Sequence, residues 1–150
     1  MNPAGRTKLI IMKFDELRAI GHNIADSLAS GIGLLIGYYQ MDIFGEAGRS
    51  PEGFITVDFL TGTCPVGTPS QSLARAIALY KDALSDLCTR HGTSISAFRE
   101  LTARYSVDAY GTRFIVTTED QQGHRSTDDY VGVPGRRPKV IGHLGRVRHK

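Results

Sequence analysis

The chain has 150 residues, of which 41% are hydrophobic and 22% are charged, with two cysteines, no tryptophan and a formal net charge of +3. This length fits one domain with a single core, which excludes a multidomain enzyme, and two cysteines are too few for a secreted domain held by disulfides. The charge is unevenly divided, because six Lys and Arg residues and no acid follow Tyr130, which leaves twelve basic against fifteen acidic residues before it.

The N-terminal segment carries a short apolar run. Arg6 and Lys8 precede Leu9–Met12, but this run is shorter than the hydrophobic region of a signal peptide and has no small-residue cleavage site after it. We therefore expect no export signal, reduced thiols and a cytoplasmic location. Met12 would also serve as a start, so residues 1–11 are either an upstream extension or an added first strand.

The first half of the chain predicts one helix and two strands. Helical spacing of apolar residues predicts a helix from about Asp15 to Ser30, with Gly31 as its C-terminal stop. Residues 34–44 and 54–60 are predicted to be antiparallel strands, joined by a turn over 45–53. The weakly polar stretch 27–41 is shorter than the roughly 20 residues of a membrane helix, so we expect no membrane span.

The second half predicts a more regular helix and three strands. Apolar residues step by three and four along an amphipathic helix, which Thr68-Pro69-Ser70 opens and Gly92 closes. The apolar positions are Leu73, Ile77, Tyr80, Leu84, Leu87 and His91. Strands are predicted over 98–107, 113–119 and 124–130, with hairpin turns at 108–111 and 120–123.

This order predicts an α+β domain. We expect a two-layer sandwich in which two helices lie on one face of an antiparallel sheet of about five strands. Arg18-Ala19-Ile20 and Arg75-Ala76-Ile77 occupy matching places in the two helices, as two tandem helix–strand–strand units would have them. Residues 1–130 form the predicted domain. Residues 131–150, rich in Gly, Pro and basic residues, form a predicted flexible tail.

The segment Thr61–Ser70 is the most site-like part of the sequence. It leaves a predicted strand and enters the second helix, whose N-terminus can hold an anion and can lower the pKa of a nearby thiol. This predicts Cys64 as a reactive thiol. The accompanying anion or ligand contacts are Gly62, Thr63, Gly67, Thr68 and Ser70. The alternative is an ordinary capped loop with a small apolar cysteine, since neither a cysteine phosphatase nor a P-loop pattern is complete here.

Two other spacings suggest metal ligands without completing a site. His22 and Asp26 lie one helical turn apart, but two ligands do not make a metal site, and a solvated face shared with Arg18 is the favoured interpretation. Cys88 and His91 are three residues apart, where a core cysteine and a histidine near the helix C-terminus are the alternative. We predict no metal site and no cofactor.

One face of the predicted sheet should be uncovered. Glu100, Thr102 and Arg104 share a face by the period of two, so that face is either hydrated or a dimer surface. Aromatic residues gather in the first predicted hairpin, where core packing and sheet-to-sheet contact are both open. They are Tyr38, Tyr39, Phe44, Phe54 and Phe59. We predict a homodimer, because two-fold dimers are the commonest soluble assemblies.

The basic tail adds a second kind of contact. Its six cations can neutralise phosphates, but no aromatic residue follows Tyr130, so contact with nucleic acid should be weak and nonspecific. The cations are Arg136, Arg137, Lys139, Arg146, Arg148 and Lys150. The sequence therefore favours a small non-catalytic binding or oligomerisation module whose tail contacts nucleic acid or an acidic protein. The alternative is a small enzyme or ligand-binding protein that uses the segment Thr61–Ser70.

Overall fold

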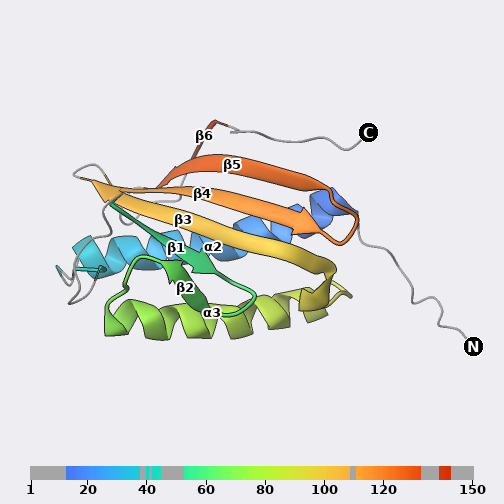
Figure 1. Cartoon of the computed structure of the whole chain (residues 1–150), viewed down its shortest axis with the longest axis horizontal. Coiled ribbons are helices and arrows are strands. Elements are labelled where there is room, and N and C mark those ends of the chain that lie inside the picture. Colours follow the sequence, from blue (N-terminus) through green and yellow to red (C-terminus); the bar gives the residue numbers. More distant parts are fainter. Residues whose placement is uncertain are drawn as a thin grey trace, which may run out of the picture.

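The computed structural model describes residues 13–37, 40, 42–44, 53–108, 111–132 and 139–142. These form two long helices, a short 3-10 turn and six strands (Figure 1). In chain order they are α2 (Phe14–Gly37), β1 (Phe54–Asp58), β2 (Thr63–Val66), α3 (Gln71–Arg90), η1 (Ile95–Ala97), β3 (Phe98–Asp108), β4 (Gly111–Asp120), β5 (Arg125–Gly132) and β6 (Lys139–Gly142).

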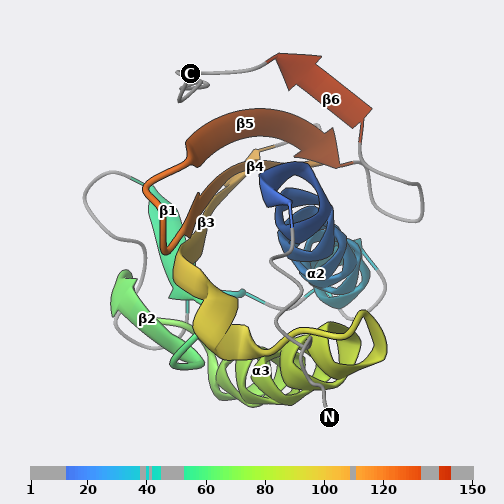
Figure 2. The ribbon, with the colours of Figure 1, turned by 90° about the vertical axis from the view of Figure 1, so that its right-hand side faces the viewer.

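The strands form one antiparallel sheet in the order β2-β1-β3-β4-β5-β6. Figure 2 shows that the sheet curves around α2, while α3 lies against α2 and next to β2. Both helices are therefore on the same side of the sheet. The predicted α+β class, with two helices on one face of an antiparallel sheet, is confirmed, and the sheet has six strands rather than about five.

The core fills the space between α2, α3 and the concave face of the sheet. Its largest fully buried side chains include Phe44, Phe59, Tyr105 and Phe114. Two tyrosine hydroxyls also fix the layers, because Tyr105 Oη donates to the Ala25 carbonyl at 2.8 Å and Tyr80 Oη donates to the Ser27 carbonyl at 3.0 Å. The first bond joins the sheet to α2, and the second joins α3 to α2.

Helix α2 runs seven residues beyond its predicted end. The stretch from Leu34 to Gly37 is helical, so the predicted strand over 34–44 is wrong there. The stop signal at Gly31 is overridden because Ile32 in the next turn is fully buried in the core. Tertiary burial of this kind routinely outweighs local propensity. The predicted turn over 45–53 lies outside the described residues except for Gly53.

Gly21 lets α2 lie close against the sheet. A Cβ atom built at this position would come within 2.7 Å of Leu101 Cδ1 and 3.4 Å of Thr118 Oγ1. Two neighbouring strands, β3 and β4, therefore contact the helix backbone at this glycine. By length and composition α2 is also apolar enough to cross a membrane. Many of its apolar side chains, including Leu17, Ile24 and Leu28, are buried in the core, whereas Leu34 is 42% exposed.

Helix α3 and the long strands lie where the sequence predicts them. Ser70 is the N-cap of α3 and accepts from the Leu73 amide at 3.2 Å, and His91 is its C-cap. The predicted strands over 98–107, 113–119 and 124–130 are β3, β4 and β5, each within two residues at either end. The turn between β4 and β5 is closed by Asp120, whose Oδ1 accepts from the amides of Gln122 and His124 at 3.0 and 2.9 Å.

The two edge strands were not predicted. Strand β2 contains Pro65, which an edge strand tolerates because one side of it forms no ladder hydrogen bonds. Strand β6 pairs with β5 and lies within the predicted tail. Residues 133–138 and 143–150 lie outside the described residues, so the flexible tail stays a prediction for them.

Candidate functional site

The segment Thr61–Ser70 is not a single loop. Its first residues close the turn between β1 and β2, its middle is strand β2, and its end leads into α3. Gly62 and Gly67 therefore lie at opposite ends of an extended strand, up to about 17 Å apart at about 3.3 Å per residue. The predicted anion contacts are distributed along the sheet edge rather than gathered around one ligand.

Three of these residues have a structural role at their own places. Thr63 Oγ1 lies 2.7 Å from Thr61 Oγ1 in the hairpin turn. Gly67 has a φ of 89°, which favours glycine. A Cβ atom there would also lie 2.8 Å from the carbonyl oxygen of Phe54 in β1, so a larger residue would not fit. Ser70 caps α3, and its own amide donates to the Ile43 carbonyl at 2.8 Å. Thr68 is exposed.

Cys64 packs against the core from β2. Burial raises the pKa of its thiol to about 11 from an ordinary value of 9.0. A nucleophilic or redox-active thiol needs the opposite shift, because the thiolate is the reactive form. Cys88 is fully buried in α3, as the core interpretation of this residue predicts.

The cations of the tail are mostly beyond the described residues. Arg136, Arg137, Arg146, Arg148 and Lys150 lie outside them, and Lys139 begins β6. The strand register nevertheless shows where this part of the chain leaves and rejoins the sheet. Gly132 at the end of β5 is paired with Thr112 at the start of β4, and Lys139 is paired with Val131. In the sequence, Arg136 and Arg137 come between these two points.

A polar cluster joins α2 to β5, and the sequence did not reveal it. Asp128 of β5 is fully buried and binds Arg18 through two hydrogen bonds, Nε to Oδ2 at 2.9 Å and Nη2 to Oδ1 at 2.8 Å. His22 Nε2 lies 2.9 Å from Asp128 Oδ2, and His22 Nδ1 is hydrogen-bonded to Tyr130 Oη. The side chains of Arg18 and His22 are each only 16% exposed, so the solvated helix face that the sequence favoured is wrong for these two residues.

This Arg18–His22–Asp128–Tyr130 cluster mainly joins helix α2 to strand β5 of the sheet. Tyr130 also stacks on Phe114 with ring centroids 5.0 Å apart, and burial together with the Asp128 charge raises its pKa to about 12. The phenol is therefore held protonated. The two ring nitrogens of His22 lie against Asp128 and Tyr130, one nitrogen against each residue. Across the described residues, no group of three His, Cys, Asp or Glu side chains is arranged to hold a metal ion.

The opposite, outward face of the sheet holds a cationic patch. The guanidinium of Arg104 on β3 lies 3.9 Å from the ring centroid of Phe54 on β1. Arg113 on β4 is 53% exposed and binds the buried carboxylate of Asp129 at 2.7 Å. Register places Ser106 between Phe54 and Arg113, and Ile115 beside Arg104. We call this set, Phe54, Arg104, Ser106, Arg113 and Ile115, the arginine end of the sheet.

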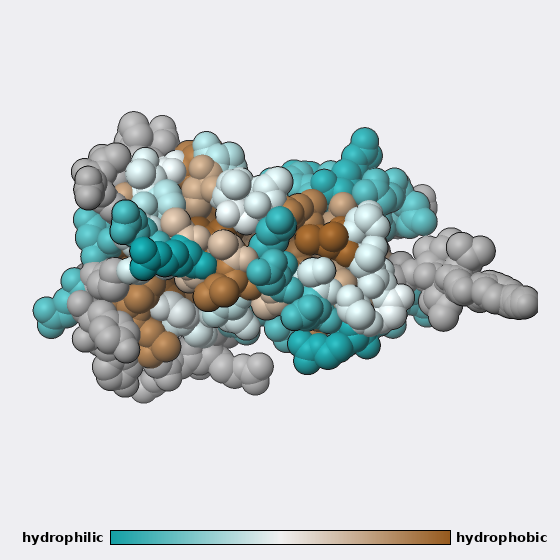
Figure 3. Space-filling model, turned by 90° about the horizontal axis from the view of Figure 1, so that it is seen from below, coloured by the Kyte–Doolittle hydropathy of each residue, from teal (hydrophilic) through white to brown (hydrophobic). Residues whose placement is uncertain are grey.

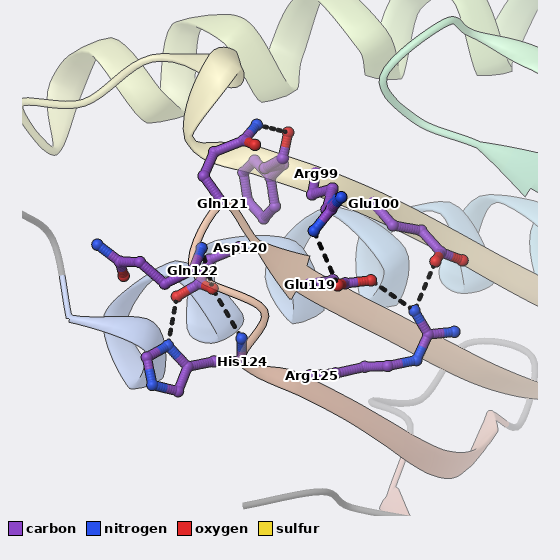
Figure 4. A network of polar contacts seen from close by, with 9 residues as sticks. Arg99, Glu100, Glu119, Asp120, Gln121, Gln122, His124 and Arg125 are labelled. Atoms are coloured by element: carbon purple, nitrogen blue, oxygen red, sulfur yellow. Dashed lines mark hydrogen bonds and ion pairs between the residues drawn. The ribbon is translucent and has the colours of Figure 1, made fainter. Parts of the chain in front are cut away.

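The other end of the same face is acidic and internally paired. Figure 4 shows Arg125 between Glu100 and Glu119, with Nη1 at 2.7 and 2.8 Å from one oxygen of each, and Arg99 beside Glu119 at 3.8 Å. Thr102 donates to Glu100 at 3.1 Å. Glu100, Thr102 and Arg104 thus share the outward face, as predicted from their spacing.

The aromatic residues of the first predicted hairpin have different positions. Phe44 and Phe59 are buried in the core, while Phe54 is on the outward face. Tyr38 and Tyr39 lie outside the described residues. Among the described residues with placed side chains, the apolar members of the outward face are Phe54, Ile115 and Val66, which pairs with Thr56 and is 40% exposed, so this face is mostly polar.

Comparisons with known proteins found no relative of this chain. No protein-family model matches the chain, and neither the curated proteins nor the solved structures contain a match.

Proposed function

We propose that this protein is a non-catalytic binding module that holds a single nucleic-acid strand on the outward face of its sheet, at the arginine end. The observation that supports this most directly is the stack of Arg104 on Phe54, next to Arg113, on a face that neither α2 nor α3 covers. The proposal extends the sequence-based expectation of a binding module with a basic tail.

The chemistry of the arginine end fits a nucleic-acid strand. Bases stack on aromatic rings and on guanidinium planes, and arginine N–H groups donate to phosphate oxygens. Arg104 and Phe54 supply one stacked pair of planar groups, and Arg113 supplies a guanidinium fixed by Asp129. Two arginines against one aspartate leave this end of the face positive.

The tail can extend the same surface. Strand β5 ends and β6 begins at this end of the sheet, and the sequence places Arg136 and Arg137 between them. Arg146, Arg148 and Lys150 follow β6. These five cations belong to the same chain, and if they contribute to binding the affinity for a strand should fall steeply with salt.

An acidic protein would use the charges but not the ring. Its carboxylates would pair with Arg104 and Arg113, whereas nothing in it need stack on Phe54. The presence of an aromatic–arginine pair at the centre of the patch favours the nucleic acid. The alternative of a reactive thiol has less support, because burial shifts the pKa of Cys64 upward.

The test is a binding titration of the intact chain with a fluorescein-labelled twelve-nucleotide single strand, followed by anisotropy between 25 and 200 mM salt. We expect binding that weakens with salt. Arg104→Gln and Phe54→Leu should each weaken it by about tenfold, because one lost stacking contact is worth about 1–3 kcal/mol. Ending the chain after Gly142 should reduce the salt dependence by removing three cations.

Arg99→Gln is the matched control. Arg99 is also an exposed arginine of β3, but it lies at the acidic end beside Glu119, so its removal should leave strand binding unchanged. Equal losses for Arg104→Gln and Arg99→Gln would show general charge attraction only. Tighter binding of a polyglutamate peptide than of the strand would favour the acidic protein, and salt-insensitive or absent strand binding would overturn the proposal.

A further inference from the structure

The helix side of the molecule, opposite the proposed strand-binding face, carries a separate pocket. It lies between the first half of α2 and the last turns of α3 and has a volume of about 340 Å³. That is within the range of about 300–1,000 Å³ typical of small-molecule sites. Its lining residues are Glu16, Ala19, Ile20, Asn23, Leu87 and His91.

We propose that this pocket binds a small organic amine, an ammonium group attached to a compact apolar body. The apolar body would lie on the floor of the pocket. Ile20 is buried at 3% exposure and Leu87 is half-buried, and both pack with the core. Figure 3 views this side and shows apolar side chains set between hydrophilic ones. Ala19 leaves the space open because its side chain is a single methyl group.

The rim of the pocket is polar and favours a cation. Glu16, Asn23 and His91 are all exposed, and Glu16 carries the formal negative charge. The backbone amide of Lys13 donates to Glu16 Oε1 at 3.2 Å, which fixes this carboxylate in the first turn of α2.

These groups together define the ligand class. An ammonium group can donate to the Glu16 carboxylate and to the amide oxygen of Asn23, while the apolar body removes Ile20 and Leu87 from water. A carboxylate ligand of the same shape would instead meet the like charge of Glu16, which repels it. The site thus selects for positive charge as well as for size.

The experiment compares two probes of the same shape, phenethylamine and 2-phenylethanol, by NMR titration of the intact protein. We expect the amine to bind about tenfold more tightly, which is the usual effect of one charge-assisted hydrogen bond. Glu16→Gln should remove this difference while leaving the alcohol unaffected, because glutamine still accepts from the Lys13 amide. Ala19→Trp should abolish binding of both probes by filling the pocket.

Ala78→Trp is the control, since Ala78 is an exposed residue of α3 that does not line the pocket. It should leave both affinities unchanged. The proposal is wrong if the two probes bind the unaltered protein equally or not at all. It is also wrong if Ala19→Trp leaves amine binding intact, because the amine then binds elsewhere. Strand binding at the arginine end is measured separately, so failure of one site leaves the other standing.

Discussion

Asp128 joins β5 to α2 through polar contacts with Arg18 and His22. Its carboxylate is fully buried, yet it accepts two hydrogen bonds from Arg18 and lies 2.9 Å from His22. A buried charge is tolerated when its partners satisfy it, and removal of one partner leaves the other charge uncompensated. The side chain is therefore far more important to stability than a surface carboxylate of the same type.

Asp128→Asn should destabilise the fold by about 3 kcal/mol, within the range measured for breaking buried ion pairs. The amide keeps the shape of the side chain, but it removes the charge that Arg18 and His22 bind. Urea unfolding at pH 7 measures the change in the free energy of unfolding. Asp86→Asn, at an exposed position of α3, should change it by less than about 0.5 kcal/mol. Equal effects of the two substitutions would contradict this role of Asp128.

Tyr130 should make the fold less stable in alkali. Its pKa is about 12 in the folded protein against an ordinary value of 10.0, because burial, and then the Asp128 charge, disfavour the phenolate. The unfolded chain therefore loses this proton first, so stability should fall as pH rises from about 10 to 12 and should not depend on this group below that window. Urea unfolding at several pH values should show a smaller alkaline loss for Tyr130→Phe. An unchanged loss would exclude Tyr130 as a cause.

At the scale of elements, local signals predicted the segments whose structure is locally determined. Helix α3 has strong apolar periodicity and a serine cap, and it lies between the predicted opening at Thr68-Pro69-Ser70 and the predicted stop at Gly92. Strands β3, β4 and β5 alternate clearly, and Asp120 and Gly123 mark the turn between the last two. In these places propensity, pattern and turn chemistry agree, so the sequence alone is sufficient.

The mispredicted elements depend on contacts between distant parts of the chain. Helix α2 continues past Gly31 because the sheet buries Ile32, and β2 forms around Pro65 because it is an edge strand. The same reason hid the polar cluster. Arg18 and Asp128 are 110 residues apart, and no spacing rule connects them. For the arginine end, the alternation along β3 predicted that Arg104 faces outward, but the sequence did not predict that Phe54 lies beside it.

At the scale of the whole molecule, the outward face of the sheet has two ends of opposite charge. Arg104 and Arg113 outnumber Asp129 at one end. At the other end Glu100, Glu119 and Asp58, which is paired with Thr102, outnumber Arg99 and Arg125. Two copies could meet face to face about a two-fold axis that lies in the interface and crosses the strands. Each positive end would then lie against the partner's negative end. The predicted homodimer and the proposed strand-binding site would then use the same surface.

Dimerisation and strand binding should therefore compete. Light scattering of the free protein at tens of micromolar should return a dimer that weakens with salt, since charge complementarity would hold its ends together. Excess twelve-nucleotide strand should convert it to complexes of one chain with one strand, because Phe54 and Arg104 cannot contact a base and a second copy at once. A monomer in the absence of nucleic acid would disprove the dimer. A complex that retains two chains would show that the dimer uses another face.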